Sequence, residues 1–448
     1  MREGSLEAPT RHPLAWKEPQ FWDEKALDEE MRRVFDICHG CRRCFNLCDS
    51  FPRLFDLVDA APSEELDTVK SEDFAPVVEA CTLCDMCYMT KCPYVPPHEF
   101  NLDFPHLMLR YRAVQARKGT KNWTAGQLAE MDRNGTLAVA LAPAANWASA
   151  TQNRLLRNTM EATVGIDSRA DLPKFHSKTF VMTDRGDPAM ANDKAPGFGK
   201  RKAAIYATCF VNYNKPDAGM AARNLLNHLG VETKVTYPAC CGMPFLEQAD
   251  LERVETQAIK VAKALRPLIE QGYDIVTPTA SCGLMFKFEW PLIVPDNEDV
   301  KLLAKATFDV DEYVVDIAKK EGLPPGMQPV EGGITVHLAC HARAQNMGPK
   351  AAEMLKLIPQ TKVDVIERCA GHGGTFGVLK ETRDLATKVG KPVFRSAAQQ
   401  GNAHIASDCP LAAKHIVQGV RDMPDGTKRP VEPVHPVQLM ARAYGLIE

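Results

Sequence analysis

The sequence lacks an excess of positive charge: its 448 residues carry 54 Lys and Arg against 57 Asp and Glu, a net charge of −3. Proteins that bind nucleic acid concentrate basic residues on one face, so this balance argues against a nucleic-acid partner. The sequence also lacks the run of about twenty apolar residues that spans a bilayer. Its most apolar window, Leu137–Ala150, is short and is interrupted by Pro143 and Asn146, so we expect no transmembrane segment.

Two further signals are missing from the sequence. The N-terminal stretch MREGSLEAPTRHPLAWKEP has no apolar core of the kind that a secretion signal requires. We therefore expect a cytoplasmic chain that reaches the inner face of a membrane only through a partner or an amphipathic surface. Nothing matches the G-x-G-x-x-G pattern of dinucleotide-binding proteins, because Gly197 and Gly199 follow no clear strand. The chain is not expected to bind its own flavin.

Cysteine, in contrast, is abundant. The 15 cysteines are expected to stay reduced in the cytoplasm and to be available to metals. Eight of them form two tight runs with the spacings C-x2-C-x2-C-x3-C and C-x2-C-x2-C-x4-C. The first run comprises Cys38, Cys41, Cys44 and Cys48, and the second comprises Cys81, Cys84, Cys87 and Cys92.

This spacing is typical of two-cluster [4Fe–4S] ferredoxins, in which three cysteines of a run bind one cluster and the fourth binds the other. The predicted sets are Cys38, Cys41, Cys44 and Cys92 for cluster 1, and Cys81, Cys84, Cys87 and Cys48 for cluster 2. Two alternatives fit the eight cysteines less well. A structural zinc site needs only four ligands in all, and a disulfide framework belongs to small secreted domains. One departure is Asp49, which follows Cys48 where a ferredoxin usually has proline. A cluster pair of this kind predicts one-electron transfer.

The C-terminal half contains an internal repeat. The cysteines that align at nearly constant offsets are Cys209, Cys240 and Cys282 in the first copy, and Cys340, Cys369 and Cys409 in the second. Short stretches before them predict strands at 203–207, 233–237 and 275–278, and at 334–338, 362–366 and 403–406, and the first strand of each copy is apolar. Strands alternating with helices at this spacing predict βαβ units around a small parallel sheet. Cysteines at the carboxyl ends of such strands meet where these sheets bind ligands.

The first copy carries an additional cysteine, because Cys241 directly follows Cys240. With Cys209 and Cys282 these residues supply four thiolates. They are sufficient for an unusual iron–sulfur cluster, or for a redox-active thiol site with Cys240 and Cys241 as candidate catalytic residues. Cysteines that merely fill the core are the alternative, and the matching of six cysteines across a repeat weighs against it.

The second copy has Ala370 at the position of Cys241. The cysteines that remain are Cys340, Cys369 and Cys409. Three thiolates and the imidazole of His372 would make a closed four-coordinate zinc site. The same residues would otherwise hold a cubane with one non-cysteine ligand, or be a vestige retained for stability. The sequence leaves these three interpretations open.

A chain of this length is too long for one hydrophobic core and predicts about three domains. The expected fold class is α+β: a helical two-cluster ferredoxin domain followed by a duplicated α/β pair. The predicted ranges are 1–32 for an N-terminal extension, 33–117 for the ferredoxin-like domain, 118–202 for a helical connector, and 203–325 and 326–448 for the two cysteine-rich domains. Helices are predicted at 26–35 and at 152–163, the latter ended by Gly165.

From about residue 33 onward the chain resembles fused proteins that join a two-cluster ferredoxin to two CCG domains. This family includes the C subunit of anaerobic glycerol-3-phosphate dehydrogenase and iron–sulfur subunits of glycolate oxidase and heterodisulfide reductase. The matching motifs are the two ferredoxin runs, Cys240-Cys241-Gly242-Met243-Pro244, His337-Leu-Ala-Cys340-His341 and Cys369-Ala-Gly-His-Gly-Gly-Thr-Phe-Gly377. The resemblance implies that the ferredoxin part relays electrons and that the CCG pair performs the terminal exchange.

The chain departs from the heterodisulfide reductase members of this family. There, each CCG domain binds a non-cubane cluster through five cysteines, whereas Met285 and Ala412 stand here at the last cysteine position of the two copies. The first copy keeps four of the five thiolates and the second keeps three. The resemblance therefore implies a third cluster in the first copy and makes a second non-cubane cluster unexpected.

The favoured function is an iron–sulfur electron-transfer subunit, an oxidoreductase component rather than a stand-alone enzyme. It would exchange electrons with a partner, expected to be a flavoprotein dehydrogenase, and pass them to or from a terminal acceptor. The expected cofactors are two [4Fe–4S] clusters, a third iron–sulfur cluster in the first CCG domain, and zinc in the second. The alternative is a heterodisulfide or thiol–disulfide reductase with its chemistry at the first CCG site.

Overall fold

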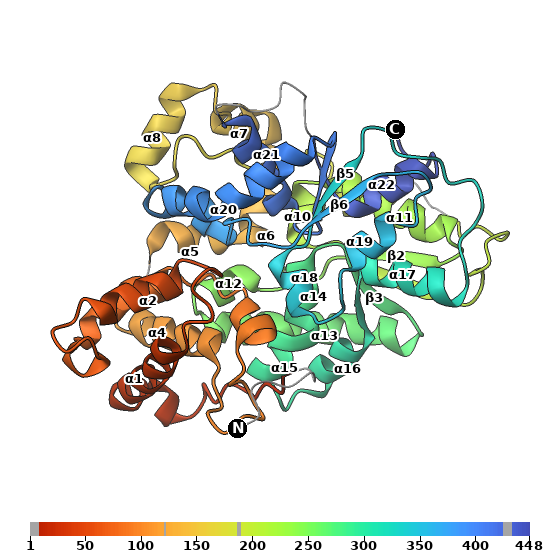
Figure 1. Cartoon of the computed structure of the whole chain (residues 1–448). Helices are drawn as coiled ribbons and strands as arrows, with labels where there is room; N and C mark the ends of the chain where they lie inside the picture. The colour runs from red at the N-terminus through yellow and green to blue at the C-terminus, as the bar shows by residue number, and fades with distance from the viewer. Residues whose placement is uncertain (1–8, 121, 186–189, 424–431) are drawn as a thin grey trace.

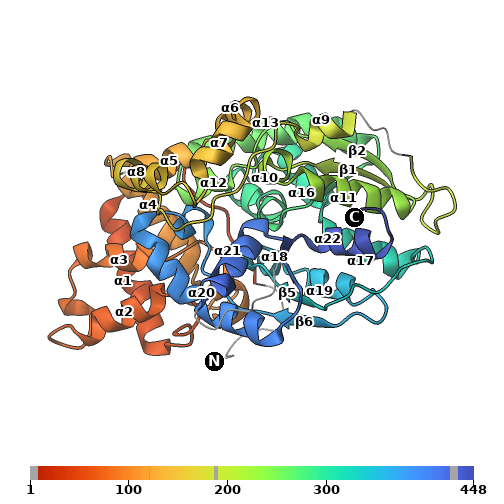
Figure 2. The same ribbon diagram turned by 90° about the horizontal axis from the view of Figure 1, so that it is seen from above.

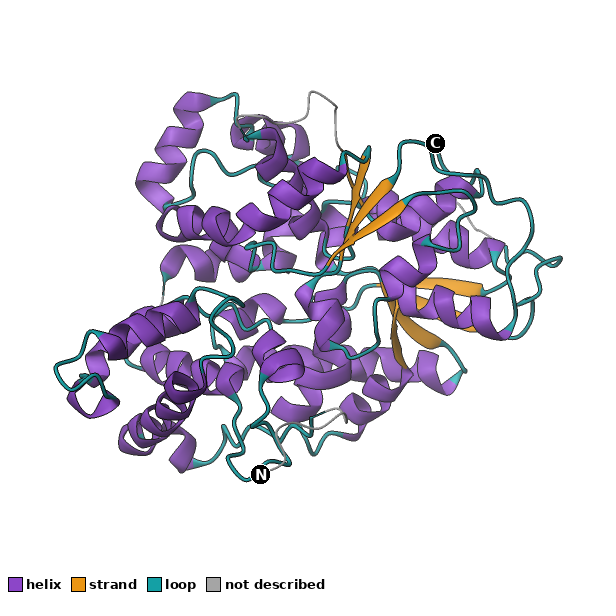
Figure 3. Ribbon diagram, viewed as in Figure 1, coloured by secondary structure: helices purple, strands orange, loops and turns teal. Residues whose placement is uncertain are grey.

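The computed structural model describes residues 9–120, 122–185, 190–423 and 432–448. The N-terminal region is helical, and two small sheets follow it in the C-terminal half (Figures 1 and 3). Among the helices that the structure describes, none combines the length and the apolar character required to cross a bilayer.

The N-terminal region is a bundle of short helices. Its main helices are α1 (Glu24–Cys41), α2 (Ser50–Asp59), α3 (Ala75–Glu79) and α4 (Phe104–Arg117). Asp23 caps α1 by accepting the backbone N–H of Ala26 at 2.7 Å, as expected of an N-cap aspartate. The helix continues beyond the predicted range 26–35 and ends at Arg42, whose φ of 52° is left-handed. It therefore delivers Cys38 and Cys41 on its last turn.

Aromatic side chains hold this bundle together. In α2 the buried apolar residues are Phe51, Leu54, Phe55 and Val58, which have the i, i+3, i+4 spacing of an amphipathic helix. Phe51 stacks at a tilt on Phe104 of α4, with ring centroids 4.7 Å apart. Phe35 of α1 meets Phe74 edge to face at 5.0 Å. Phe51 and Phe55 also line the cavity around the first set of cysteines.

The connector is a set of short helices on the outside of the molecule (Figure 2). They are α5 (Trp123–Ala129), α6 (Met131–Ala140), α7 (Ala142–Ser149), α8 (Arg154–Val164) and α9 (Phe180–Arg185). The helix predicted at 152–163 is confirmed as α8, and Gly165 ends it with a left-handed φ of 69°. The chain then joins the second CCG domain, because Ile166 forms a β-bridge with Leu379.

The first CCG domain is built on four parallel strands in the order β2-β1-β3-β4. The strands are β1 (Lys202–Tyr206), β2 (Glu232–Thr236), β3 (Asp274–Thr277) and β4 (Thr307–Asp309). The helices are α10 (Cys209–Tyr213), α11 (Pro216–His228), α12 (Met243–Glu247), α13 (Leu251–Glu270), α14 (Ala280–Leu284), η5 (Met285–Glu289), α15 (Trp290–Ile293), α16 (Glu298–Ala306) and α17 (Val310–Lys320).

The second CCG domain repeats this topology in the order β6-β5-β7-β8, again all parallel. The strands are β5 (Ile334–His337), β6 (Val363–Ile366), β7 (His404–Ala406) and β8 (Glu432–Val434). The helices are α18 (Cys340–Ala344), α19 (Lys350–Leu355), η6 (Gly374–Gly377), α20 (Lys380–Gln400), α21 (Pro410–Arg421) and α22 (Pro436–Ala443). The identical strand order establishes the repeat as a structural duplication.

The two CCG domains share a hydrophobic core. Val314 of α17 and Leu225 of α11 belong to the same buried cluster as Ile334 of β5 and Leu439 of α22. Helix α14 also packs against α18, which brings the cysteine-bearing ends of the two sheets together. The α+β class, with two cysteine-rich α/β domains after a helical region, is confirmed. The predicted domain limits stay predictions.

The segment before α1, predicted as an N-terminal extension, contacts both the helical region and the first CCG domain. Leu14 donates its N–H to the carbonyl of Leu292 at 2.8 Å, and Trp16 donates its indole N–H to Ile293 at 2.9 Å. Both acceptors belong to α15 of the first CCG domain, while Thr10 accepts the hydroxyl of Tyr88 beside the second cysteine run at 2.9 Å. The segment therefore ties the helical region to the first CCG domain.

Candidate functional site

The first set of cysteines lines a small cavity at the surface of the helical region. The residues around this cavity include Cys38, Cys41, Cys44 and Cys92, together with Arg43, Phe51, Phe55, Pro93, Tyr94 and Leu102. Burial raises the pKa of the Cys38 thiol well above its usual value, and Cys92, Cys44 and Cys41 raise it further. Cys92 thus lies with the first three cysteines of the other run, and four thiols face one space.

The second set lies deeper in the molecule. Burial raises the pKa of Cys48, and the neighbouring thiols of Cys84 and Cys81 raise it further. Cys81 and Cys87 are buried, whereas all four cysteines of the first set are partly exposed. The backbone wraps around this set through left-handed φ angles of 50° at Leu83 and 61° at Asp85. The first set is therefore the outer one and the second set the inner one.

The first CCG domain brings its four cysteines together at the carboxyl ends of β1, β2 and β3. Cys209 opens α10 after β1, Cys240 and Cys241 follow β2, and Cys282 lies in α14 after β3. The Sγ atoms of Cys209 and Cys240 are 3.8 Å apart, and those of Cys241 and Cys282 are 3.3 Å apart. All four side chains are buried. Four buried thiols are a donor set that suits an iron–sulfur cluster.

Polar groups from outside the sheet hold the paired cysteines in place. Asp132 of α6 accepts the backbone N–H of Cys240 at 3.0 Å and the hydroxyl of Tyr237 at 2.5 Å. Trp290 donates its indole N–H to the carbonyl of Cys241 at 3.2 Å. Sequence reasoning missed Asp132, since nothing in a single sequence connects it with a cysteine 108 residues away.

The second CCG domain places its three cysteines in the equivalent positions. Cys340 opens α18 after β5, Cys369 follows β6, and Cys409 caps α21 after β7. Burial raises the pKa of Cys340 well above its usual value, and Cys84, Cys369 and Cys409 raise it further. The thiol of Cys369 accepts the N–H of Gly371 at 3.3 Å. The three thiols thus form a single cluster of side chains.

This second set adjoins the inner ferredoxin set. Burial raises the pKa of Cys84 to about 12, and the nearby thiol of Cys369 is the next largest cause. Cys369 also raises the pKa of Cys48. Thr82 lies very close to Gly373, because a Cβ added to Gly373 would be only 2.7 Å from the methyl group of Thr82. Sequence reasoning ranked the second copy below the first, yet it is the second copy that lies against the second cysteine run.

Two half-buried histidines of the second CCG domain, His341 and His372, follow Cys340 and Cys369 closely in the sequence. Burial lowers the pKa of His372 to about 4, and its Nε2 has no hydrogen-bond partner among the described residues. Burial likewise lowers the pKa of His341 to about 4, and its Nδ1 lies 2.8 Å from the hydroxyl of Ser281 in the first CCG domain. His341 therefore joins the two CCG sites.

The predicted zinc site does not have single-ion geometry. In the described part of the chain, no three Cys, His, Asp or Glu side chains converge closely enough to hold one metal ion. His372 instead lies beside His415, with ring centroids 6.0 Å apart. A four-iron cube spreads its cysteine ligands over separate corners, so the same finding does not weigh against the cluster sets. The three-thiol set fits a cluster better than zinc.

A buried charged cluster lies next to the inner ferredoxin set. Its members are Arg11, Asp85, Asp103, His106 and Glu289. Asp85 stands between two cysteines of the second run, and Arg11 contacts it through two nitrogens at 2.8 and 3.0 Å. Sequence reasoning also missed this cluster, because its members come from four separate parts of the chain.

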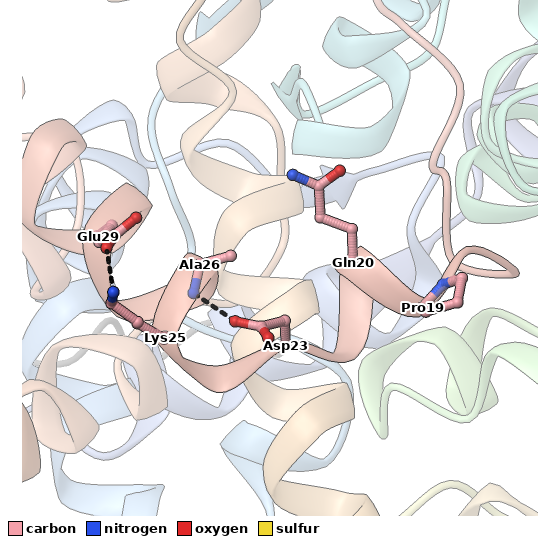
Figure 4. Close-up of a pocket in the computed structure, with 6 residues that line it drawn as sticks. All are labelled: Pro19, Gln20, Asp23, Lys25, Ala26 and Glu29. Carbon is pink, nitrogen blue, oxygen red and sulfur yellow. Dashed lines mark hydrogen bonds and ion pairs between the residues drawn. The ribbon is translucent and has the colours of Figure 1, made fainter.

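A shallow surface depression at the start of α1 is a different kind of feature (Figure 4). The residues that line it are Pro19, Gln20, Asp23, Lys25, Ala26 and Glu29. Lys25 pairs with Glu29 at 3.7 Å, and both side chains are well exposed. It contains no thiol or imidazole, and we assign it no function.

The fold and the cysteine sites define a class: a multidomain α+β protein with adjoining groups of buried or half-buried thiols. The CCG cysteine-rich domain family matches residues 203–287 and 334–412, the two domains described above. The chain is 25% identical to the C subunit of anaerobic glycerol-3-phosphate dehydrogenase from Escherichia coli (strain K12), over 70% of this chain and 76% of the relative.

Two other relatives extend the comparison. The chain is 30% identical to "Lactate utilization protein A" of Geobacillus sp. (strain WCH70), over 40% of this chain and 76% of the relative. It is 27% identical to the B subunit of fumarate reductase (CoM/CoB) from Methanothermobacter marburgensis, over 56% of this chain and 48% of the relative. The chain belongs to the fused ferredoxin/CCG-domain iron–sulfur oxidoreductase family, as its motifs indicate.

Proposed function

We propose that this chain is the electron-transfer subunit of a larger oxidoreductase. Membership of the family supports an electron-transfer role. The observation that carries the proposal is the spatial order of the thiol groups. An outer set of four adjoins an inner set of four, the inner set adjoins the three thiols of the second CCG domain, and α18 packs against α14 of the first.

Each set has a donor group that fits an iron–sulfur cluster. We assign cluster 1 to Cys38, Cys41, Cys44 and Cys92, cluster 2 to Cys81, Cys84, Cys87 and Cys48, and a third cluster to Cys209, Cys240, Cys241 and Cys282. Such clusters supply reversible one-electron transfer when bound. The protein excludes water from the deeper sets and supplies the hydrogen bonds and charges that tune their potentials.

The second CCG domain has a connecting role in this proposal. Cys340, Cys369 and Cys409 lie between the inner ferredoxin set and the first CCG site, and His341 bonds to Ser281 across the domain boundary. We assign these three thiols and His372 to a cluster site with one non-cysteine ligand. The donor that this assignment uses is the Nε2 of His372, which has no hydrogen-bond partner in the described part of the chain.

The partner is proposed to be a flavoprotein dehydrogenase subunit. The outer set lines a cavity at the surface, and all four of its cysteines are partly exposed, so we assign the entry or exit of electrons to this surface. One relative is named as a subunit of a dehydrogenase, and the sequence contains no G-x-G-x-x-G motif for a flavin of its own.

The alternative function, disulfide reduction at Cys240 and Cys241, is less well supported. A substrate sulfur would have to reach these thiols, and both side chains are only 2% exposed. Asp132 and Trp290 cover the backbone of the pair. Electron relay needs no such access, so it is the function that we adopt.

Crossed ligation is testable in anaerobically purified protein. Cys92→Ser is expected to remove the EPR signal of cluster 1, because Cys92 binds that cluster together with three cysteines of the first run. Cys48→Ser is expected to remove the signal of cluster 2. The control is Cys409→Ser, which is expected to leave both ferredoxin signals intact. If Cys48→Ser abolished the same signal as Cys41→Ser, the crossed assignment would be wrong.

A further inference from the structure

An uncharged stretch of twenty residues runs through two connector helices. From Asn134 to Asn153 the sequence contains no Asp, Glu, Lys, Arg or His. The stretch covers most of α6 and all of α7, which contact one another and lie at the outer edge of the molecule (Figure 2). Helices at the surface of a globular protein normally turn charged residues toward water.

The large apolar side chains of this stretch point outward. We call the exposed residues Leu137, Leu141, Pro143 and Trp147 the α6–α7 apolar face. Leu137 is 62% exposed, Leu141 64% and Trp147 67%. The i, i+4 spacings, 137 to 141 and 143 to 147, put the members of each pair on the same side of the chain. The core does not use these side chains.

The inner side of α6 is already committed to the protein. Asp132 bonds to Cys240 and Tyr237, and Gly135 lies so close to Tyr213 that a Cβ would meet its ring at 2.3 Å. The helix therefore cannot roll over to bury its leucines. The apolar face stays outward, one helix away from the thiols of the first CCG site.

We propose that the α6–α7 apolar face binds the surface of a lipid bilayer. The proposal deepens the proposed function, on which it rests, by naming what lies beyond the first CCG site. Helices with an apolar side insert it at the boundary between headgroups and acyl chains, and tryptophan is enriched at that depth. Arg133 and Arg154 are both exposed, and they flank the uncharged stretch where lipid phosphates would meet them.

A protein partner fits this face less well. The four side chains expose on the order of 400 Å², about half of the area that each partner contributes to a stable protein interface. Protein interfaces also use a polar rim with hydrogen bonds and arginine, whereas the stretch between Arg133 and Arg154 carries no charge. A bilayer needs neither a larger area nor a matched rim.

Vesicle flotation tests the proposal directly on the full chain with its native cofactors. The probes are vesicles of phosphatidylcholine and of phosphatidylcholine with phosphatidylglycerol. The wild-type chain is expected to float with both, and more strongly with the anionic vesicles. Leu137→Glu combined with Leu141→Glu is expected to lower the bound fraction at least tenfold. The matched control is Leu357→Glu, at a leucine that is 40% exposed on the second CCG domain, which is expected to bind like the wild type.

Tryptophan fluorescence gives a second readout. Trp16 and Trp290 are buried, so a lipid-induced change must come from the exposed tryptophans. Quenching by brominated lipid is expected to fall sharply in Trp147→Phe, while that variant still floats. Equal quenching in the variant and the wild type would place the face away from the lipid.

Three outcomes would overturn the proposal. The wild-type chain could stay unbound with both vesicle types, or the double glutamate variant could float as well as the wild type. The chain could instead self-associate without lipid and lose this association in the variant, in which case a second copy covers the face. Iron content and EPR signals are independent of these results, so a chain without clusters that still floated would refute the proposed function and leave the lipid surface standing.

Discussion

Replacing Arg11 by methionine removes the only cation that contacts three carboxylates at once in the described charged cluster. Arg11 lies 2.8 Å from Asp85, 2.8 Å from Asp103 and 3.1 Å from Glu289. The side chains of Arg11, Asp85 and Glu289 are 11%, 6% and 4% exposed. Methionine keeps the length and most of the apolar stem, so the change chiefly removes the charge.

The expected change in the free energy of unfolding follows from the loss of the cation that neutralises these carboxylates. Removing one partner of a buried ion pair costs about 3–5 kcal/mol, because the other partner is left as an uncompensated buried charge. His106 stays 3.2 Å from both Asp103 and Glu289, which limits the loss. We therefore expect the free energy of unfolding of the helical region to fall by about 3 kcal/mol, near the lower end of that range. Denaturant unfolding followed by far-UV circular dichroism measures this change.

The pH dependence separates the loss of charge from a loss of packing. Although burial opposes it, the charges of Arg11 and His106 lower the pKa of Asp103 to about 2. For Asp85 burial already prevails and raises the pKa to about 6 beside Arg11. Without Arg11 we expect burial to raise the pKa of Asp103 as well, above the value of about 4 in the unfolded chain. When the pKa of a carboxyl is higher in the folded than in the unfolded state, the protein loses stability as the pH rises through the folded-state pKa. The deficit of Arg11→Met is thus expected to be smaller at pH 5 than at pH 8.

A surface arginine provides the control for this prediction. Arg266 contacts Glu270 at 2.7 Å and Asp299 at 2.6 Å on an exposed helix face. Because exposed ion pairs contribute little, Arg266→Met is expected to leave the unfolding midpoint unchanged. The reasoning would be refuted if Arg11→Met were as stable as Arg266→Met, or if its deficit were the same at both pH values.

The remaining predictions concern the contact between connector and first CCG site. Gly135→Ala forces a Cβ to within 2.3 Å of the Tyr213 ring and is expected to cost about 1–3 kcal/mol, measured by thermal unfolding. Gly126→Ala, where no atom lies within 4 Å, is expected to be neutral or stabilising, and equal melting temperatures of the two variants would contradict the packing. Asp132→Ala leaves the Cys240 N–H without its acceptor, so it is expected to change the spectrum of the first CCG site and to leave the ferredoxin signals unchanged. A change confined to the ferredoxin signals would rule out this role of Asp132.

Much of the CCG fold was predictable from local pattern. The predicted strand 334–338 corresponds to Ile334–His337, and 233–237 to Glu232–Thr236. Short apolar runs before a cysteine define the central strands well, because a buried parallel strand needs apolar side chains on both faces. The edge strand Glu232–Thr236 is partly exposed and was found from its place in the repeat. The strands that were missed, Thr307–Asp309 and Glu432–Val434, have three residues each and are not followed by a cysteine. The other strands were found from the cysteines that follow them, and these two have no such marker.

The arrangement of the sites was less predictable than their residues. The cysteines were grouped by run from their local spacing, and by repeat from the nearly constant offsets between the two copies. Two features of the sites depend on how separate domains pack. Cys369 lies near Cys84, and Asp132 bonds to Cys240. Neither arrangement leaves a signal in one sequence, because the residues are far apart along the chain and individually ordinary. The second CCG copy was considered a poorer metal site than the first because it has fewer cysteines. Its position against the second cysteine run could not be known from the sequence.

The central claim is that these thiol sets hold iron–sulfur clusters, and metal analysis tests it most directly. Iron, zinc and acid-labile sulfide would be measured per chain on anaerobically purified protein. Two cubanes and a four-iron cluster in the first CCG domain predict about twelve irons with a similar amount of sulfide, and a cluster at the second CCG site would add up to about four. Zinc in place of iron, or iron without sulfide, would contradict the claim.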